Sequence, residues 1–179
     1  MRKKILWITR TGVLLALLVT LQVLTKGFGQ LATGSFVNAV LAVAALAGGF
    51  GCGITVALIS PVLAYLLGIA PQILTVPVIM VGNALYVLLL HLVTGKNNRI
   101  PGKILGLLAA AAGKFAALYG LVTWGICGLL AQPLLESGLL KAPMLQALPA
   151  TFSWPQLFTA LVGGGVALAI TPVLRKAVK

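Results

Sequence analysis

Long apolar runs, separated by short groups of glycine, proline and charged residues, set the possible folds of this chain. A helix needs roughly 20 apolar residues to cross the hydrocarbon core of a bilayer, where backbone groups must pair with one another. The runs and the breakers between them predict six transmembrane helices, at residues 9–25, 35–50, 52–68, 73–94, 104–130 and 155–173. The expected fold class is an all-α integral membrane protein, a compact six-helix bundle forming one domain over residues 1–179.

The composition agrees with a bilayer environment and argues against nucleic acid. Hydrophobic residues make up 60% of the chain and charged residues 8%, whereas about a quarter of the residues of a soluble domain are charged. The net charge is +12, but the basic residues lie at the ends of apolar runs and not on one face, as a nucleic-acid surface requires. The lipid bilayer is the expected surrounding, and no nucleic-acid partner is expected.

The positions of lysine and arginine predict the orientation in the membrane. An even number of spans places both termini on one side, and the side richer in lysine and arginine is cytoplasmic. Lys26 and Lys141 fall on the other side. The terminal side carries Arg2, Lys3, Lys4, Arg10, Lys96, Arg99, Lys103, Arg175, Lys176 and Lys179. Both termini are therefore expected in the cytoplasm.

Acidic residues are nearly absent. The sequence has no aspartate and one glutamate, Glu136, and its one histidine is His91. Carboxylate pairs, metal-binding carboxylates and proton relays therefore cannot be assembled, and an isolated histidine is weak support for a metal or a catalytic base. We predict no catalytic residue, no metal and no cofactor.

One charge interrupts the fifth apolar run, in "LLAAAAGKFAALYGLVTWG". Lys114 follows Lys103 by 11 residues, which is roughly 16 Å of helix and reaches near the middle of a core about 30 Å thick. A lysine at that depth is costly and indicates a functional site, here a cation that lines a polar cavity. In the alternative, the span begins near Ala111 and Lys114 lies at the membrane interface.

A polar stripe is predicted on the fourth span. Asn83 follows Gln72 by 11 residues, so it approaches the same depth as Lys114 from the outer side. Spacings of three and eleven residues place Tyr86 and Gln72 on the face of Asn83. The stripe is expected to face inward toward a ligand; the alternative is that its amide joins neighbouring helices by hydrogen bonds.

Further polar and aromatic side chains lie near the outer ends of the spans. Asn38 clusters there with Gln22 and Gln30, and Trp124 lies in the outer part of the fifth span. For the tryptophan the alternative is an aromatic belt at the membrane interface. The candidate substrate-binding residues are Asn38, Gln72, Asn83, Tyr86, Lys114 and Trp124.

The first span carries a face of small residues. Gly12, Ala16 and Thr20 recur every four residues, a spacing that lets another helix backbone approach closely. They are the candidate residues for docking to another protein. The alternative is a contact inside the same bundle.

The last outer connection is long and unusually apolar. It reads "AQPLLESGLLKAPMLQALPATFSW", whereas a solvated linker is expected to be polar. We expect the segment from Gln132 to Phe152 to fold onto the bundle as a lid.

At this point the sequence resembles a known family, the substrate-binding S components of energy-coupling factor (ECF) vitamin transporters of the riboflavin, folate and pantothenate type. The resemblance covers most of the chain and rests on the order of its features. These are the six-span layout, the small-residue first helix, "GSFVNAVLAVAALAGGFGCGITVALISPVLAYLLG", the fourth-span "GNALYVLLL" and a fifth-span lysine followed by aromatic residues.

The resemblance implies a membrane-embedded subunit that captures a water-soluble vitamin from outside. It implies a pocket that opens outward and is capped by the outer loops, with Asn83 and Lys114 for the ligand. It also implies that the first three helices face a transmembrane coupling subunit served by two ATPase subunits, in a bacterial cell membrane. The docking stripe of the family is usually alanine-based, whereas here it reads Gly12, Ala16 and Thr20.

Two other classes of function are weaker. A stand-alone channel or facilitator needs a continuous polar path, but the cytoplasmic halves of the spans are apolar and rich in glycine and alanine. An intramembrane hydrolase needs a nucleophile beside a base, and the pair available is Ser60 with His91, on different spans.

Overall fold

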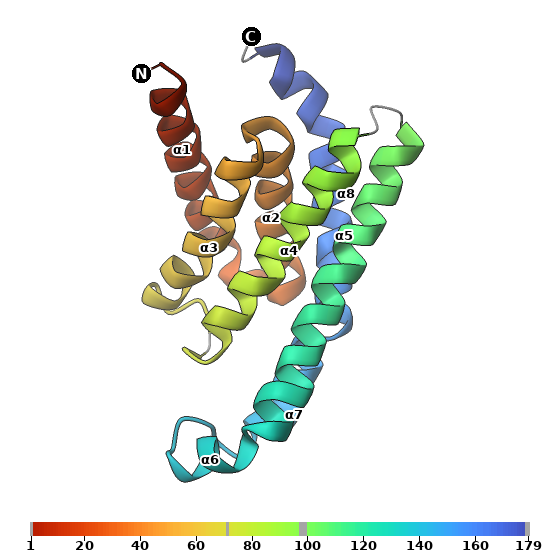
Figure 1. The fold of residues 1–179 in the computed structure, drawn as a ribbon. Coiled ribbons are helices and arrows are strands. Elements are labelled where there is room, and N and C mark those ends of the chain that lie inside the picture. The colour runs from red at the N-terminus through yellow and green to blue at the C-terminus, as the bar shows by residue number, and fades with distance from the viewer. Residues whose placement is uncertain (1, 71, 97–99, 178–179) are drawn as a thin grey trace.

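The computed structural model describes residues 2–70, 72–96 and 100–177, and this part of the chain consists of helices joined by turns (Figure 1). Arg99 and Lys179, which the orientation argument used, lie outside the described residues. The elements are α1 (Arg2–Thr25), η1 (Lys26–Phe28), α2 (Gln30–Val43), η2 (Ala44–Gly48), α3 (Phe50–Leu66), α4 (Thr75–Lys96), α5 (Ile100–Gly120), η3 (Leu121–Leu129), α6 (Ala131–Glu136), α7 (Met144–Thr151) and α8 (Trp154–Ala177).

Five helical stretches in the described part are long and apolar enough to cross a membrane: Lys4–Phe28, Gln30–Gly48, Thr75–Thr94, Ile100–Leu129 and Met144–Lys176. The remaining long helix, Phe50–Leu66, is apolar but shorter. Large apolar side chains are exposed on the outside of the bundle, for example Leu105 at 62% and Val173 at 68%. A soluble surface avoids so much exposed apolar area, and the all-α, multi-pass class predicted from the sequence is thus confirmed.

The helices begin or end several residues away from the predicted spans. The second helix, for instance, starts at Gln30 and not at residue 35, and the fifth starts at Ile100 and not at residue 104. Polar and basic residues bounded the predicted apolar runs, whereas helical hydrogen bonding continues through such residues into the membrane interface. The number of six membrane crossings stays a prediction, since α3 is short.

Both ends of the chain lie at the same end of the bundle (Figure 1). Helix α2 packs against α8, α4 lies between α3 and α5, and α1 packs on α2 and α3. The turn from η2 into α3 passes through Gly49, whose φ of +91° is a conformation that favours glycine. The glycine run "AGGFGCG" thus reverses the chain direction, as its composition indicates.

Two separate apolar clusters form the interior. The larger cluster joins α1, α2, α3, α4, α5 and α8 and includes Leu18, Leu41, Val56 and Leu90. The smaller cluster is built where α5 continues into η3 and includes Leu118, Val122, Leu140, Leu148 and Phe152. We call them the bundle cluster and the outer cluster.

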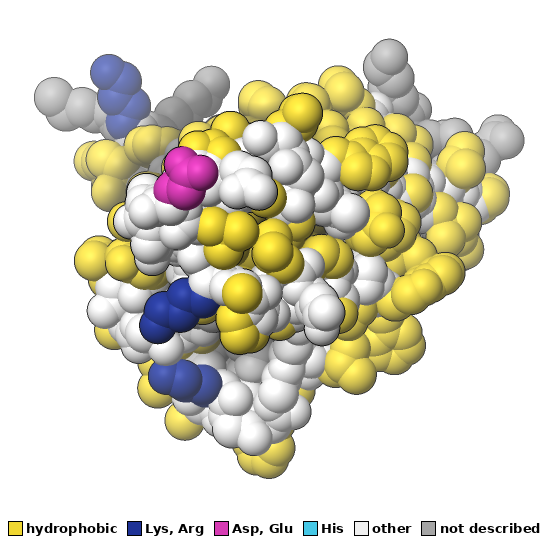
Figure 2. All heavy atoms as spheres, turned by 90° about the horizontal axis from the view of Figure 1, so that it is seen from below, with side chains coloured by type: hydrophobic (Ala, Val, Ile, Leu, Met, Phe, Trp, Pro, Cys, Tyr) yellow, Lys and Arg dark blue, Asp and Glu magenta, His cyan; other side chains and the backbone are white. Residues whose placement is uncertain are grey.

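The long apolar connection forms α6 and α7, which lie with η3 at the end of the molecule opposite the chain termini (Figure 1). Leu140, Leu148 and Phe152 bury the apolar side of this segment in the outer cluster. Figure 2 looks onto this end and shows few charged side chains. Those that the connecting segments supply are Lys26, Glu136 and Lys141.

Close packing of α2 on α8 depends on Gly163. A Cβ atom at this position would lie 2.6 Å from the backbone nitrogen of Ala39 and 2.8 Å from Cβ of Asn38. Both distances are shorter than carbon contacts allow, so a side chain here must push α2 away. Small residues serve this purpose in membrane bundles because they let two backbones approach.

We predict that Gly163→Ala lowers the stability of the bundle by about 1–3 kcal/mol, the usual cost of overpacking. The matched control is Gly165→Ala, where a Cβ atom meets nothing within 4 Å. The control should be neutral or slightly stabilising, because alanine favours helix over glycine by about 1 kcal/mol. Thermal unfolding of both variants in detergent measures the difference. Equal melting temperatures would contradict the packing role of Gly163.

Candidate functional site

A cavity of about 350 Å³ lies inside the half of the bundle away from the chain termini. It reaches from the loop residues Ile69 and Ala70 to Lys114 in the middle of α5. Its wall draws on α1, α2, α3, α4, α5 and α8 and on the end of α7. The lining residues are Gln22, Lys26, Gly29, Gln30, Thr33, Gly34, Val37, Asn38, Ser60, Pro61, Ala64, Ile69, Ala70, Ile79, Asn83, Lys114, Thr151, Phe152 and Gln156.

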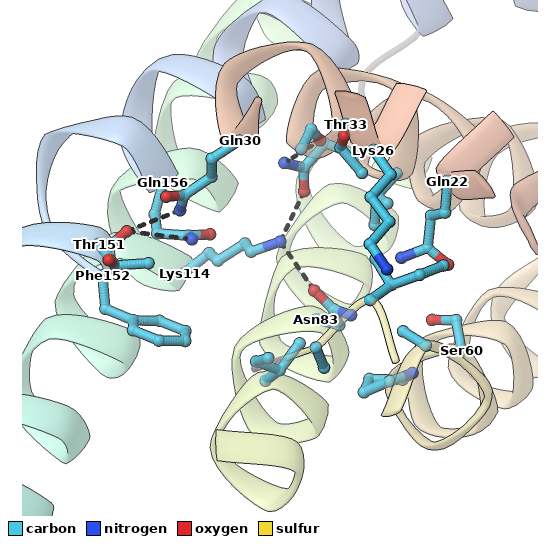
Figure 3. A pocket seen from close by; sticks show the side chains of 18 of the residues that line it. Gln22, Lys26, Gln30, Thr33, Ser60, Asn83, Lys114, Thr151, Phe152 and Gln156 are labelled. Carbon is cyan, nitrogen blue, oxygen red and sulfur yellow. Dashed lines mark hydrogen bonds between the residues drawn. The ribbon is translucent and has the colours of Figure 1, made fainter. Parts of the chain in front are cut away.

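Lys114 is the buried cation of this cavity, with 3% of its surface exposed. Its Nζ donates hydrogen bonds to Oδ1 of Asn38 at 2.6 Å and to Oδ1 of Asn83 at 2.7 Å (Figure 3). The acid that the sequence offers, Glu136, is exposed at the end of α6. In the part of the chain that the structure describes, amide oxygens therefore take the place of a carboxylate partner.

Surrounding contacts hold Asn38 and Lys114 in place. The Asn38 amide nitrogen donates to the carbonyl of Gly34 at 2.9 Å and to Oγ1 of Thr159 at 3.2 Å, which turns its oxygen toward Lys114. The ring of Tyr86 lies 5.5 Å from Nζ, within the range of a cation–π contact. The hydroxyl of Tyr86 is tied to the carbonyl of Ala160 at 2.9 Å.

The amino group retains unused donor capacity. A lysine ammonium has three N–H groups, and the described structure assigns two of them, to Asn38 and Asn83. Because Lys114 lines the cavity, the third N–H is available to an acceptor held there. The arrangement is suited to binding an anion or a carbonyl oxygen.

Two buried polar atoms of the cavity wall have no hydrogen-bond partner among the described residues: Oε1 of Gln22 and Oγ of Ser60. Gln22 is 7% exposed and Ser60 is 1% exposed. A buried polar atom left unpaired costs about 1–3 kcal/mol. Each atom has less than 1 Å² of accessible surface, so its side chain must turn toward the cavity before water or a ligand can pair with it.

Hydrogen bonds to backbone carbonyls join the segments around the rim of the cavity. Nε2 of Gln30 donates to the carbonyl of Thr151 at 2.7 Å, and Nε2 of Gln156 approaches the same oxygen at 3.4 Å (Figure 3). Across the rim, Nζ of Lys26 donates to the carbonyl of Gly68 at 2.8 Å. The beginnings of α2 and α8 are thus joined to the end of α7.

The structure brings three of the sequence-predicted site residues, Asn38, Asn83 and Lys114, into direct contact. Helix α5 begins at Ile100, so Lys114 lies well inside a continuous helix, and its depth in the membrane stays a prediction. Asn38 lies well inside α2 and not at its outer end. Counting helical rise thus predicted that Asn83 and Lys114 lie at one level, as their hydrogen bond shows, but it did not place Asn38 beside them.

The other predicted binding residues lie outside the cavity. Tyr86 is buried behind Lys114. Gln72 precedes α4, which begins at Thr75, so helical spacing does not place it on the stripe with Asn83. Trp124 is 71% exposed on η3. In a helix that is apolar all round, the sequence gives no register to show which side an aromatic residue faces.

Several lining residues have a role that the sequence did not reveal. For Lys26 the sequence predicted only a charge on the outer side of the membrane, although its position directly after the first span indicates a place at the rim of the cavity. Ser60 was considered only as a nucleophile for His91, but His91 borders a different cavity, with Lys103 and Arg175. Phe152 reaches the wall from the connecting segment, where no periodicity reports its direction.

The small-residue face of α1 is exposed. Gly12, Ala16 and Thr20 all lie on the outside of the bundle. A Cβ atom at Gly12 would meet nothing within 4 Å. In the described structure this face therefore makes no close helix contact inside the bundle.

We predict that Asn38→Ala destabilises the chain by about 1.5–3 kcal/mol more when Lys114 is present than when it is replaced by methionine, the range for a hydrogen bond to a charged group. The bonds of Asn38 to Gly34 and Thr159 are lost in both backgrounds and cancel in this double-mutant cycle. Melting curves of the four proteins in detergent give the coupling. Additive effects would mean that the pair does not interact.

The sequence matches one family model over almost its full length. The model described as "ECF transporter, substrate-specific component" matches residues 7–175, nearly the entire chain. No curated protein and no solved structure shows significant similarity to it. The chain therefore belongs to the family of substrate-specific components of ECF transporters.

Proposed function

We propose that this protein captures a vitamin or a related water-soluble molecule from outside a bacterial cell and delivers it to an ATP-driven coupling module. The observation that carries the proposal is the buried Lys114, held by Asn38 and Asn83 at the floor of an internal cavity. Family membership supplies the class, a substrate-specific subunit. A polar floor beneath largely apolar walls is the usual form of a small-molecule site.

The charge distribution supports a cavity that opens to the outside. Lys4, Arg10, Lys103, Arg175 and Lys176 belong to the end of the bundle that carries the chain termini. The opposite end, where the cavity lies, carries Lys26 and Lys141. By the positive-inside rule the terminal end faces the cytoplasm. We therefore propose a plasma-membrane protein with both termini cytoplasmic.

Energy for uptake is proposed to come from partner subunits. The sequence contains no G-x-x-x-x-G-K-[ST] motif for nucleotide phosphates. It also lacks the aspartate and membrane-embedded glutamate on which ion-coupled transporters rely. The ECF family implies a coupling module. We propose that this module comprises one transmembrane coupling subunit and two ATPase subunits.

The exposed face of Gly12, Ala16 and Thr20 is the proposed docking surface for the coupling subunit. Its small side chains leave the α1 backbone open to a partner helix. The stripe runs along the helix that also carries Gln22 into the cavity. One helix therefore serves both the ligand and the partner in this proposal.

We predict that Ala16→Trp removes the coupling subunit and the ATPase subunits from the purified protein, with at least about a tenfold loss in yield of complex, equivalent to about 1.4 kcal/mol. A bulky ring on this face prevents close helix approach. Affinity purification from native membranes, followed by mass spectrometry, measures the loss.

The matched control is Ala112→Trp, which places the same ring on an exposed site of α5. This variant should retain the partners, and both variants should keep the melting temperature of the parent. Full recovery of partners with Ala16→Trp would exclude docking through this face. Absence of ATPase subunits from the parent protein would remove the proposed function itself.

We also predict that the segment from Gln132 to Phe152 closes over an occupied cavity. Thr151 and Phe152 already line its wall, whereas α6 and the loop after it do not. A mixture of water-soluble vitamins at saturating concentration should slow proteolysis of this segment, because ordering it lowers the population of open states. Cleavage of this segment at the same rate with and without the vitamins would argue against a lid.

A further inference from the structure

We propose that the cavity selects a small aliphatic acid with two different ends. A carboxylate binds at Lys114 and Asn83, and a hydroxyl or amide N–H group binds at Gln22 and Ser60. This inference rests on the proposed function and names the class of molecule that the site accepts.

The Lys114 end calls for an anionic acceptor. Two of the three N–H groups of Lys114 are assigned to amide oxygens. The amide nitrogen of Asn83 donates no hydrogen bond within the described structure, although the residue lines the cavity. A carboxylate has two oxygens with about four acceptor positions. One such group therefore accepts from Lys114 and Asn83 together and supplies the counter-charge that the wall lacks.

The charges of the wall disfavour a cationic molecule. The cavity lining contains two lysines, Lys114 at the floor and Lys26 at the rim, and it contains no acid. Both cations raise the electrostatic potential inside the cavity. A positively charged molecule would be repelled there, whereas an anion is attracted.

The opposite end calls for a hydrogen-bond donor. Gln22 on α1 and Ser60 on α3 belong to helices that pack on each other, and Figure 3 shows both across the cavity from the stem of Lys114. The unpaired atom of Gln22 is a carbonyl oxygen, which only accepts. A ligand group that pairs with this oxygen must therefore be an O–H or an N–H group.

The apolar part of the cavity lining suits an aliphatic body. Val37, Pro61, Ala64 and Ile79 contribute apolar side chains to the cavity wall. Phe152 is the one aromatic residue among the lining residues that the structure describes. A broad flat ring would therefore lack a second aromatic side chain on which to stack. The volume of about 350 Å³ is near the lower end of the range for small-molecule sites.

The test uses a library of small hydroxy and amido carboxylic acids, each paired with its neutral carboxamide, together with riboflavin as a flat ring and thiamine as a cation. Pantothenate and its amide are one such pair. The purified chain in detergent is mixed with the library, and mass spectrometry identifies the retained compounds. Calorimetry then compares each retained acid with its carboxamide.

Retention of donor-bearing acids, with carboxamides bound at least about tenfold more weakly, is the expected result, since a hydrogen bond to a charged group has about that effect. Lys114→Met should abolish the difference between acid and amide. Gln22→Leu should weaken the acid about threefold to tenfold while leaving that difference intact. The matched controls Lys141→Met and Gln146→Leu change exposed residues of the outer segment and should change neither quantity.

Preferential retention of thiamine, of riboflavin or of carboxamides would overturn the inference. Retention of no compound would overturn it as well, because the library contains the proposed class. Neither outcome touches the proposed function if the chain still copurifies with coupling and ATPase subunits. Loss of that copurification is the separate result that would remove the proposed function.

Discussion

A buried amino group with no carboxylate in reach must find its hydrogen bonds among neutral groups, and the described bundle is organised around this requirement. Lys114 on α5 bonds to Asn38 on α2 and Asn83 on α4, and Asn38 bonds in turn to Thr159 on α8. Four helices therefore meet through one polar network. Burying an unpaired charge is far more costly than burying a paired one, so these helices are held at the separation that keeps the network closed.

That separation is set by residues without polar groups. Gly163 lets α8 approach α2 until Asn38 and Thr159 are within bonding distance. Gly82 gives Leu118 room between α4 and α5 in the same way, because a Cβ there would lie 2.6 Å from the leucine side chain. In a bilayer the hydrophobic effect does not drive helices together, so contact area from small residues must do so. The polar network and the close packing at glycines therefore depend on the same spacing between the helices.

The fold and the centre of the site were predictable from sequence for different reasons. Apolar runs of span length allow few structures in lipid, which gave the helical class. Helical rise is constant, which gave the common depth of Asn83 and Lys114. The sequence could not show which way the Trp124 side chain points from the helix axis, since every face of its segment is apolar. The positions of Thr151 and Phe152 depend on how a connecting segment returns to the bundle. The position of Gln72 depends on where α4 begins. Neither of these features leaves a periodic signal in the sequence.

The two apolar clusters differ in how they border the cavity. Val37 packs on the bundle cluster and Ile79 on the outer cluster, and both line the cavity wall. Phe152 belongs to the outer cluster itself. The cavity thus lies along the seam between two separately packed units, and the outer unit is a candidate for local opening as one cooperative block. Movement along this seam would change access to Lys114 without breaking into the packed interior of either unit.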